Sequence, residues 1–135
     1  MEPKPLALVV EDDEDQNIIF TAALEQAGYV VKSVYDGITA RQVLAEIIPA
    51  IVILDLHMPG INGDVVLREI RTSPRLKDIR VIVATSDSSF AASLELRTEL
   101  VLLKPIGFSQ LSQLAARFAQ KKTSQETGPE KPSRI

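Results

Sequence analysis

Residues 51–60 read IVILDLHMPG. Four apolar residues, three of them branched at the β-carbon, lead directly into Asp55, and the Pro-Gly pair that follows is typical of a turn. A short apolar run bounded by turn residues indicates a strand buried on both faces, as in a parallel sheet. Asp55 is therefore predicted at the carboxyl end of a buried strand, which is the edge where open parallel sheets bind ligands.

The rest of the chain alternates between apolar runs of this kind and stretches with helical spacing of apolar residues. Further strands are predicted at residues 6–10, 30–34, 79–84 and 100–103. Helices are predicted through Phe20–Ala27, Ala40–Ile47, Val66–Ile70, Phe90–Arg97 and Phe108–Phe118. Gly28 is expected to end the first helix in the left-handed conformation, and Asn62 is expected to cap the third. This alternation predicts a doubly wound five-stranded parallel sheet, a flavodoxin-like, three-layer α/β/α fold.

Length and composition restrict the classes of function. The chain has 135 residues, enough for one domain, which we place at residues 1–120, followed by a flexible polar tail at 121–135. The absence of cysteine excludes disulfides and thiolate sites, and a single histidine excludes a multi-histidine metal site. The first 120 residues carry a net charge of −5 (11 basic, 16 acidic), which leaves no basic face for nucleic acid. No apolar run is long enough for a membrane span, so we expect a cytoplasmic protein that binds no membrane.

Polar side chains follow four of the predicted strands: Glu11 with Asp12 and Asp13, Asp55, Thr85, and Lys104. Parallel pairing would bring them to one edge of the sheet. Carboxylates about 5 Å apart repel by roughly 3 kcal/mol at an effective dielectric of 20, so the cluster calls for a cation. Oxygen ligands favour Mg²⁺, with Mn²⁺ as the alternative. A carboxylate nucleophile beside a cation and a lysine suits phosphoryl transfer through an aspartyl phosphate.

Over roughly residues 5–120 the chain resembles the receiver domains of two-component response regulators. The matching pieces, in order, are VVED at 9–12, DLHMPG at 55–60, ATS at 84–86 and KP at 104–105. The resemblance implies that Asp55 is the phosphoacceptor. It also implies that Mg²⁺ is held by Glu11, Asp12, Asp55 and the backbone carbonyl of His57. Thr85 would bond the phosphoryl group, Lys104 would pair with it, and the Lys104–Pro105 peptide would be cis.

The same resemblance implies partners: a histidine kinase or histidine phosphotransfer protein as phosphodonor, and an output protein reached by direct contact. The protein would be a monomer or a phosphorylation-dependent dimer, and it would catalyse only its own phosphorylation and dephosphorylation. The chain departs from the family at Val101, where an aromatic residue is usual, and its span from Thr85 to Lys104 is shorter. A phosphorylation-independent interaction module is therefore the alternative. A phosphatase of the haloacid dehalogenase type would need a second aspartate where His57 stands.

Overall fold

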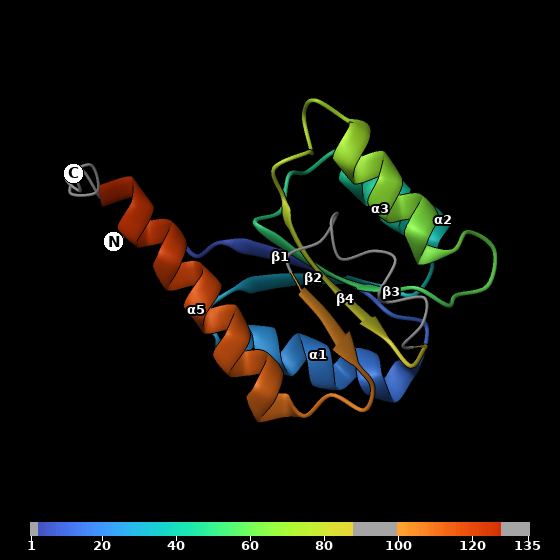
Figure 1. Cartoon of the computed structure of the whole chain (residues 1–135), viewed down its shortest axis with the longest axis horizontal. Coiled ribbons are helices and arrows are strands. Elements are labelled where there is room, and N and C mark those ends of the chain that lie inside the picture. The colour runs from blue at the N-terminus through green and yellow to red at the C-terminus, as the bar shows by residue number, and fades with distance from the viewer. Residues whose placement is uncertain (1–2, 88–99, 128–135) are drawn as a thin grey trace.

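The computed structural model describes residues 3–87 and 100–127, with side chains through residue 119. The strands are β1 (Leu6–Val10), β2 (Val30–Val34), β3 (Ile51–Asp55), β4 (Arg80–Thr85) and β5 (Leu100–Leu103). The helices are α1 (Glu14–Gln26), α2 (Gly37–Leu44), α3 (Gly63–Thr72) and α5 (Phe108–Thr127). Strands and helices alternate from β1 to β4, and α5 follows β5, as the apolar pattern predicts (Figure 1). Residues 88–99, between β4 and β5, lie outside the described part of the chain.

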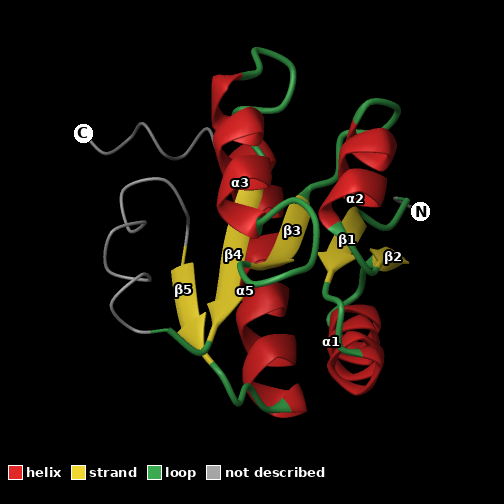
Figure 2. Ribbon diagram, turned by 90° about the vertical axis from the view of Figure 1, so that its right-hand side faces the viewer, coloured by secondary structure: helices red, strands yellow, loops and turns green. Residues whose placement is uncertain are grey.

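The five strands form one sheet in the order β2-β1-β3-β4-β5, and every pairing is parallel. Figure 2 shows them side by side with β5 and β2 at the two edges. All five residues of β3 are buried, because β3 lies at the centre of the sheet with helices over both faces. The predicted doubly wound fold is confirmed.

Two hydrophobic clusters separate the three layers. One side of the sheet packs against α2 and α3, where Leu54, Leu67 and Ile70 are buried together. The other side packs against α1 and α5, where Phe20, Ile53 and Leu111 are buried together. Neighbouring residues of β3 thus enter opposite clusters, as expected when successive side chains of a strand point to opposite faces.

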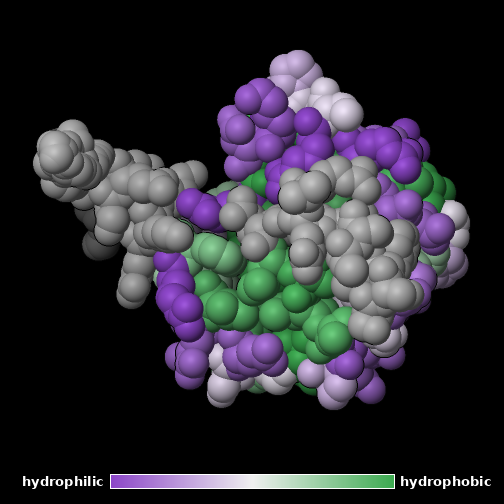
Figure 3. Space-filling view, viewed as in Figure 1, coloured by the Kyte–Doolittle hydropathy of each residue, from purple (hydrophilic) through white to green (hydrophobic). Residues whose placement is uncertain are grey.

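Hydrophobic side chains remain exposed at the β5 edge of the sheet. Leu103, at the end of β5, is 51% exposed, and Phe108, at the start of α5, is also exposed. Figure 3 shows hydrophobic residues gathered on this face of the molecule, over β5 and beside α5. The side chains of β5 are therefore less completely buried than those of β3.

Several helix ends follow the predicted signals. Gly28 has φ 104° just beyond the C-cap of α1, as predicted for a left-handed terminating residue. Asp13 caps α1 by accepting a hydrogen bond from Gln16 N at 2.9 Å. Asn62 occupies the N-cap position of α3, but its side chain makes no capping hydrogen bond. The second helix ends at Leu44, three residues before Ile47, although Ile47 N still donates to Val43 O.

The last helix is longer than its apolar spacing predicts. Helix α5 continues to Thr127, so the backbone of residues 121–127 is helical where the sequence favours a flexible tail. The division of the chain at residue 120 into a domain and a tail stays a prediction. The helix predicted at Phe90–Arg97 lies outside the described residues. In the described part of the chain, no helix combines the length and the apolar character needed to cross a membrane.

Candidate phosphoacceptor and metal site

The polar residues predicted at strand ends do lie at one edge of the sheet. Glu11 directly follows β1, Asp55 ends β3, Thr85 ends β4 and Lys104 directly follows β5. The register places Asp55 beside Ala84 and Thr85 beside Leu103, so adjacent strands end almost level with one another. Strand register, which no local pattern shows, is what brings these residues together.

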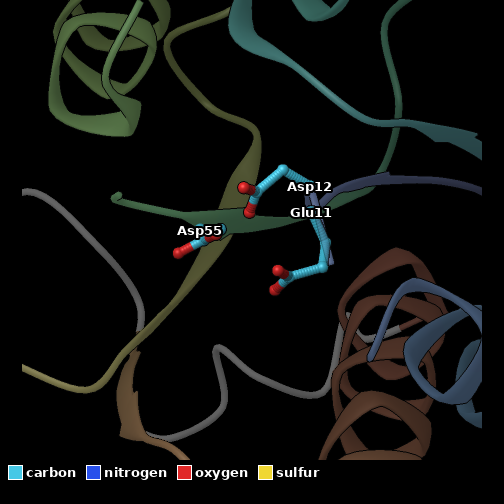
Figure 4. Close-up of side chains that lie close together, drawn as sticks. All are labelled: Glu11, Asp12 and Asp55. Carbon is cyan, nitrogen blue, oxygen red and sulfur yellow. The ribbon is translucent and has the colours of Figure 1, made fainter. Parts of the chain in front are cut away.

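Three carboxylates form the centre of the site. Carboxylate oxygens of Glu11, Asp12 and Asp55 all lie within 4.8 Å of one another. Figure 4 shows Glu11 and Asp12, adjacent at the end of β1, beside Asp55 at the end of β3. Glu11 and Asp55 are buried, with 1% and 3% exposure, whereas Asp12 is exposed. The site is thus a cluster of carboxylates that is buried at Glu11 and Asp55 and is open to solvent at Asp12.

Lys104 supplies a positive charge inside this cluster. Its Nζ lies 2.9 Å from Glu11 Oε1 and 3.5 Å from Asp55 Oδ1, and its side chain is mostly buried. The peptide between Lys104 and Pro105 is cis, as predicted. One ammonium facing three carboxylates leaves the site with excess negative charge.

The chemistry of these donors fits a divalent cation. Among the described side chains, Glu11 Oε1 is a buried oxygen without a hydrogen-bond partner, although it is ion-paired with Lys104. A carboxylate oxygen has more than one acceptor site, so the contact with Lys104 leaves Glu11 Oε1 able to bond a metal ion as well. An all-oxygen set with one open, solvent-facing side is the kind of site that Mg²⁺ or Mn²⁺ occupies.

The electrostatic environment disfavours the ionised form of Asp55. Burial raises the pKa of the Asp55 carboxyl to about 7, and the neighbouring Asp12 carboxyl and the charge of Glu11 add to this rise. Lys104 and the backbone N–H of His57, which donates to Asp55 Oδ1 at 3.2 Å, act in the opposite direction. Bringing a cation to this site would relieve the same repulsion.

A hollow of about 470 Å³ lies above the carboxylates, and the side chains that line it are Glu11, Asp12, Asp13, Gln16, Asp55, His57, Ser86, Lys104 and Pro105. Thr85 is not among them. Its side chain is fully buried, and its Oγ1 accepts a hydrogen bond from Asp87 N at 3.0 Å. The exposed side chain of His57 also lines this hollow. A metal bond from its backbone carbonyl stays a prediction.

Asn17 is a supporting residue that the sequence analysis missed. Its buried Nδ2 donates to Glu11 O and Val34 O, both at 3.0 Å, and so ties the ends of β1 and β2 to α1. Position 17 lies three residues before Phe20, on the predicted buried face of α1. A polar residue on a buried helical face must find partners, and that rule is the signal that could have identified it.

Comparison with known proteins agrees with this geometry. The family model described as the response regulator receiver domain matches residues 7–116. Response regulator MprA of Mycobacterium sp. (strain KMS) is 31% identical over 129 residues, which is 93% of this chain and 55% of that protein. The chain therefore spans about half the length of this curated relative.

Two solved structures extend the likeness to three dimensions. The signal receiver domain of a Vibrio parahaemolyticus repressor protein has a TM-score of 0.82 and 26% identity, with 94% of this chain and 98% of that chain covered. The Mn²⁺-bound form of response regulator Rcp1 has a TM-score of 0.71 and 27% identity, with 87% and 93% covered. By sequence, fold and the arrangement of its acidic edge, the chain belongs to the response regulator receiver domain family.

Proposed function

We propose that the chain is a phosphorylation-dependent signalling switch in which Asp55 accepts a phosphoryl group from a phosphohistidine of a kinase or phosphotransfer protein. The observation that carries the proposal is the position of the Asp55 carboxylate, which lies with Glu11 and Asp12 in one cluster and 3.5 Å from the Lys104 ammonium. Membership of the receiver family supports the same role. The signal would then leave by protein contact.

The proposed reaction transfers one phosphoryl group. An oxygen of Asp55 attacks the phosphorus of the donor phosphohistidine, the nitrogen–phosphorus bond breaks, and its electron pair returns to the imidazole. Lys104 pairs with a phosphoryl oxygen as charge builds there. Thr85 Oγ1 already accepts a hydrogen bond from Asp87 N, so its own proton can be donated to another phosphoryl oxygen.

Glu11, Asp12 and Asp55, with the backbone carbonyl of His57, would hold Mg²⁺ or Mn²⁺. When bound, the cation would neutralise charge on the phosphoryl oxygens. The Mn²⁺-bound relative supports a divalent cation in this fold, and the metal preference of this chain is part of the proposal. That the protein is cytoplasmic and binds neither nucleic acid nor membrane stays a prediction from its composition.

Intact-mass spectrometry after treatment with acetyl phosphate and Mg²⁺ tests the proposal. We expect one added phosphate that hydroxylamine removes, and none on Asp55→Ala. Labelling of Asp55→Ala to the wild-type extent would contradict the assignment of Asp55. A wild type that takes up no phosphate from acetyl phosphate or from phosphohistidine donors would favour the phosphorylation-independent module.

A further inference from the structure

A groove of about 520 Å³ lies between α2, α3 and the turn that follows α3. Figure 1 shows the two helices side by side over one face of the sheet. The residues that line this groove are all different from those that line the hollow over the carboxylates. The two cavities are therefore separate, and a volume of this size is typical of a small-molecule site.

The floor of the groove is apolar. Leu44, Val66, Ile70 and Leu76 line it, and all four belong to the buried hydrophobic cluster beneath α2 and α3. Ile38 adds an apolar side chain near the start of α2, and it is 52% exposed. The 8 residues of α2 give the helix a length of about 12 Å, which is close to that of a medium-length acyl chain. An apolar chain laid along α2 would remove this surface from water, which is favourable.

The charged residues that line the groove are two arginines and one glutamate. Arg41 Nε lies 2.9 Å from Glu69 Oε1. The Arg75 guanidinium donates to Leu44 O and Ile47 O at the C-terminal end of α2. A guanidinium has five N–H donors, so these contacts use only part of the bonding capacity of either arginine. Two cations against one carboxylate leave the lining positive, and planar guanidinium groups are suited to a carboxylate ligand.

We propose that the groove between α2 and α3 binds a small amphipathic carboxylate. Its apolar chain would lie along α2 over the buried side chains, and its carboxylate would contact Arg41 and Arg75. An acidic peptide fits less well, because its backbone would bring polar groups against an apolar floor that cannot bond them. This site is independent of the proposed function, since none of its residues takes part in the proposed phosphoryl transfer.

The test uses octanoate as the probe and 1-octanol as its neutral counterpart with the same chain length. Each is titrated into the isotope-labelled full chain and followed by NMR. We expect octanoate to shift the amide resonances of residues 38–45 and 66–76 in a saturable way, and to leave those of residues 11–13 in place. Octanol should bind more weakly by about two- to fivefold, because it lacks the charge that the arginines attract.

Substitutions at the two partners of one ion pair should change the affinity for octanoate in opposite directions. Arg41→Gln should weaken binding by about two- to fivefold, a modest factor because the Arg41 and Glu69 side chains are 49% and 43% exposed. Glu69→Gln should tighten binding by a similar factor, because it removes the carboxylate that competes for Arg41. A purely structural role of the pair would move both variants in the same direction. Neither substitution should change the affinity for octanol.

Arg68→Gln is the matched control, because Arg68 is an exposed arginine of α3 that does not line the groove. It should leave the affinity for octanoate unchanged, and the melting temperatures of all three variants should stay near that of wild type. Absence of octanoate binding by the wild type, equal affinity for octanoate and octanol, or weaker binding in both ion-pair variants would overturn the proposal. Labelling of Asp55 by acetyl phosphate is measured separately, so failure of either proposal is distinguishable from failure of the other.

Discussion

At Asp55 the fold holds a carboxylate where its charge is poorly solvated and faces other negative charges. The raised pKa, about 7 against the ordinary 3.8, means that ionisation costs the folded state more than the unfolded state. Lys104 offsets only part of this cost, because Glu11 shares the same ammonium. The metal-free domain is therefore strained electrostatically at the residue that the proposed reaction uses.

Asp55→Asn is expected to stabilise the metal-free domain at about pH 8, by on the order of 1–2 kcal/mol. Below about pH 4 the carboxyl is protonated in both the folded and the unfolded state, so the cost of ionisation vanishes there. That cost grows as the pH rises from about 4 to about 7 and is complete above it. The gain from the substitution should follow the same course, and urea denaturation in EDTA at several pH values measures it.

Asp78→Asn serves as the control for this experiment, because Asp78 is an exposed carboxylate beside Lys77. Its substitution should change stability little and with no comparable pH dependence. A gain from Asp55→Asn that is as large at about pH 4 as at about pH 8 would show that the strain has another origin.

At the scale of elements, the first residue of α3 packs closely against the end of β3, the strand that carries Asp55. A Cβ placed on Gly63, the first residue of α3, would lie 2.1 Å from the backbone oxygen of Asp55 and 2.8 Å from Leu56 Cα. Gly63 N also donates to Leu56 O at 3.0 Å. The start of α3 thus packs backbone against backbone on the end of β3, and only glycine permits that distance.

Gly63→Ala is expected to destabilise the domain by about 3 kcal/mol or more, because backbone rather than a flexible side chain must move. Gly107→Ala is the matched control, since a Cβ on Gly107 would meet nothing within 4 Å. Its effect should stay within about 1 kcal/mol. Urea denaturation compares the two variants. Equal stability of both would mean that α3 shifts freely relative to β3.

The far end of the α1–α5 layer is held by a buried hydrogen bond. Tyr29 OH donates to Ala115 O at 2.9 Å, which ties the start of β2 to the middle of α5. Burial raises the pKa of Tyr29 to about 12, and the charge of Arg80 opposes this rise. Arg80 also lies over the Phe118 ring at 5.3 Å, a second contact that fixes α5 to the sheet.

Tyr29→Phe is expected to lower the free energy of unfolding by about 1 kcal/mol at neutral pH. The folded pKa is raised above the ordinary 10, so the stability that Tyr29 contributes is complete below about pH 10 and is lost as the pH rises toward about 12. Wild type and Tyr29→Phe should therefore converge in that window. Tyr35→Phe, at an exposed tyrosine, should change neither the free energy of unfolding nor its dependence on pH. A constant difference across the window would contradict the assignment.

For the whole molecule, the acidic site exists only when β1 and β3 are paired. The unfolded chain separates Glu11 from Asp55 by more than forty residues, so a cation that needs both carboxylates binds the folded state. Binding to the folded state alone stabilises it by mass action. Metal affinity and global stability are thus coupled through the pairing of the strands.

Mg²⁺ is expected to raise the melting temperature of the wild type, by the equivalent of about 1.4 kcal/mol when it is tenfold above its dissociation constant. Asp12→Asn should lose most of this gain. Asp13→Asn is the matched control, because it removes the same charge beside the site, keeps a capping oxygen for α1 and lies outside the carboxylate cluster. Thermal melts with and without Mg²⁺ give the answer. Equal shifts in both variants would refute the role of Asp12.

Local patterns in the sequence determine most of the elements. The run of β-branched residues before Asp55 favours a strand that is buried on both faces, which is what β3 is. Gly28 predicts the end of α1, because glycine tolerates the left-handed backbone conformation found there. Helix ends without such a marker were less predictable. Helix α2 stops at Leu44 before its apolar spacing runs out, and α5 continues past Ala119 into residues without apolar side chains. Tertiary packing and backbone hydrogen bonding override a weak local signal at such ends.

The residues of the site could also be predicted from the sequence, because an acid, a hydroxyl or a lysine directly after an apolar run stands out from its neighbours. What only the tertiary structure decided is how these groups share charge and contacts. The Lys104 ammonium lies closer to Glu11 than to Asp55. The buried Thr85 hydroxyl accepts a hydrogen bond from Asp87 N. The side chains of His57 and Asp87, which follow the neighbouring strands β3 and β4, lie near each other. These relations depend on strand register and on side-chain directions between segments far apart in the chain. No local pattern in the sequence predicts these contacts. The apolar pattern of a strand predicts that the strand is buried, but it does not predict which residue of the neighbouring strand lies beside its end.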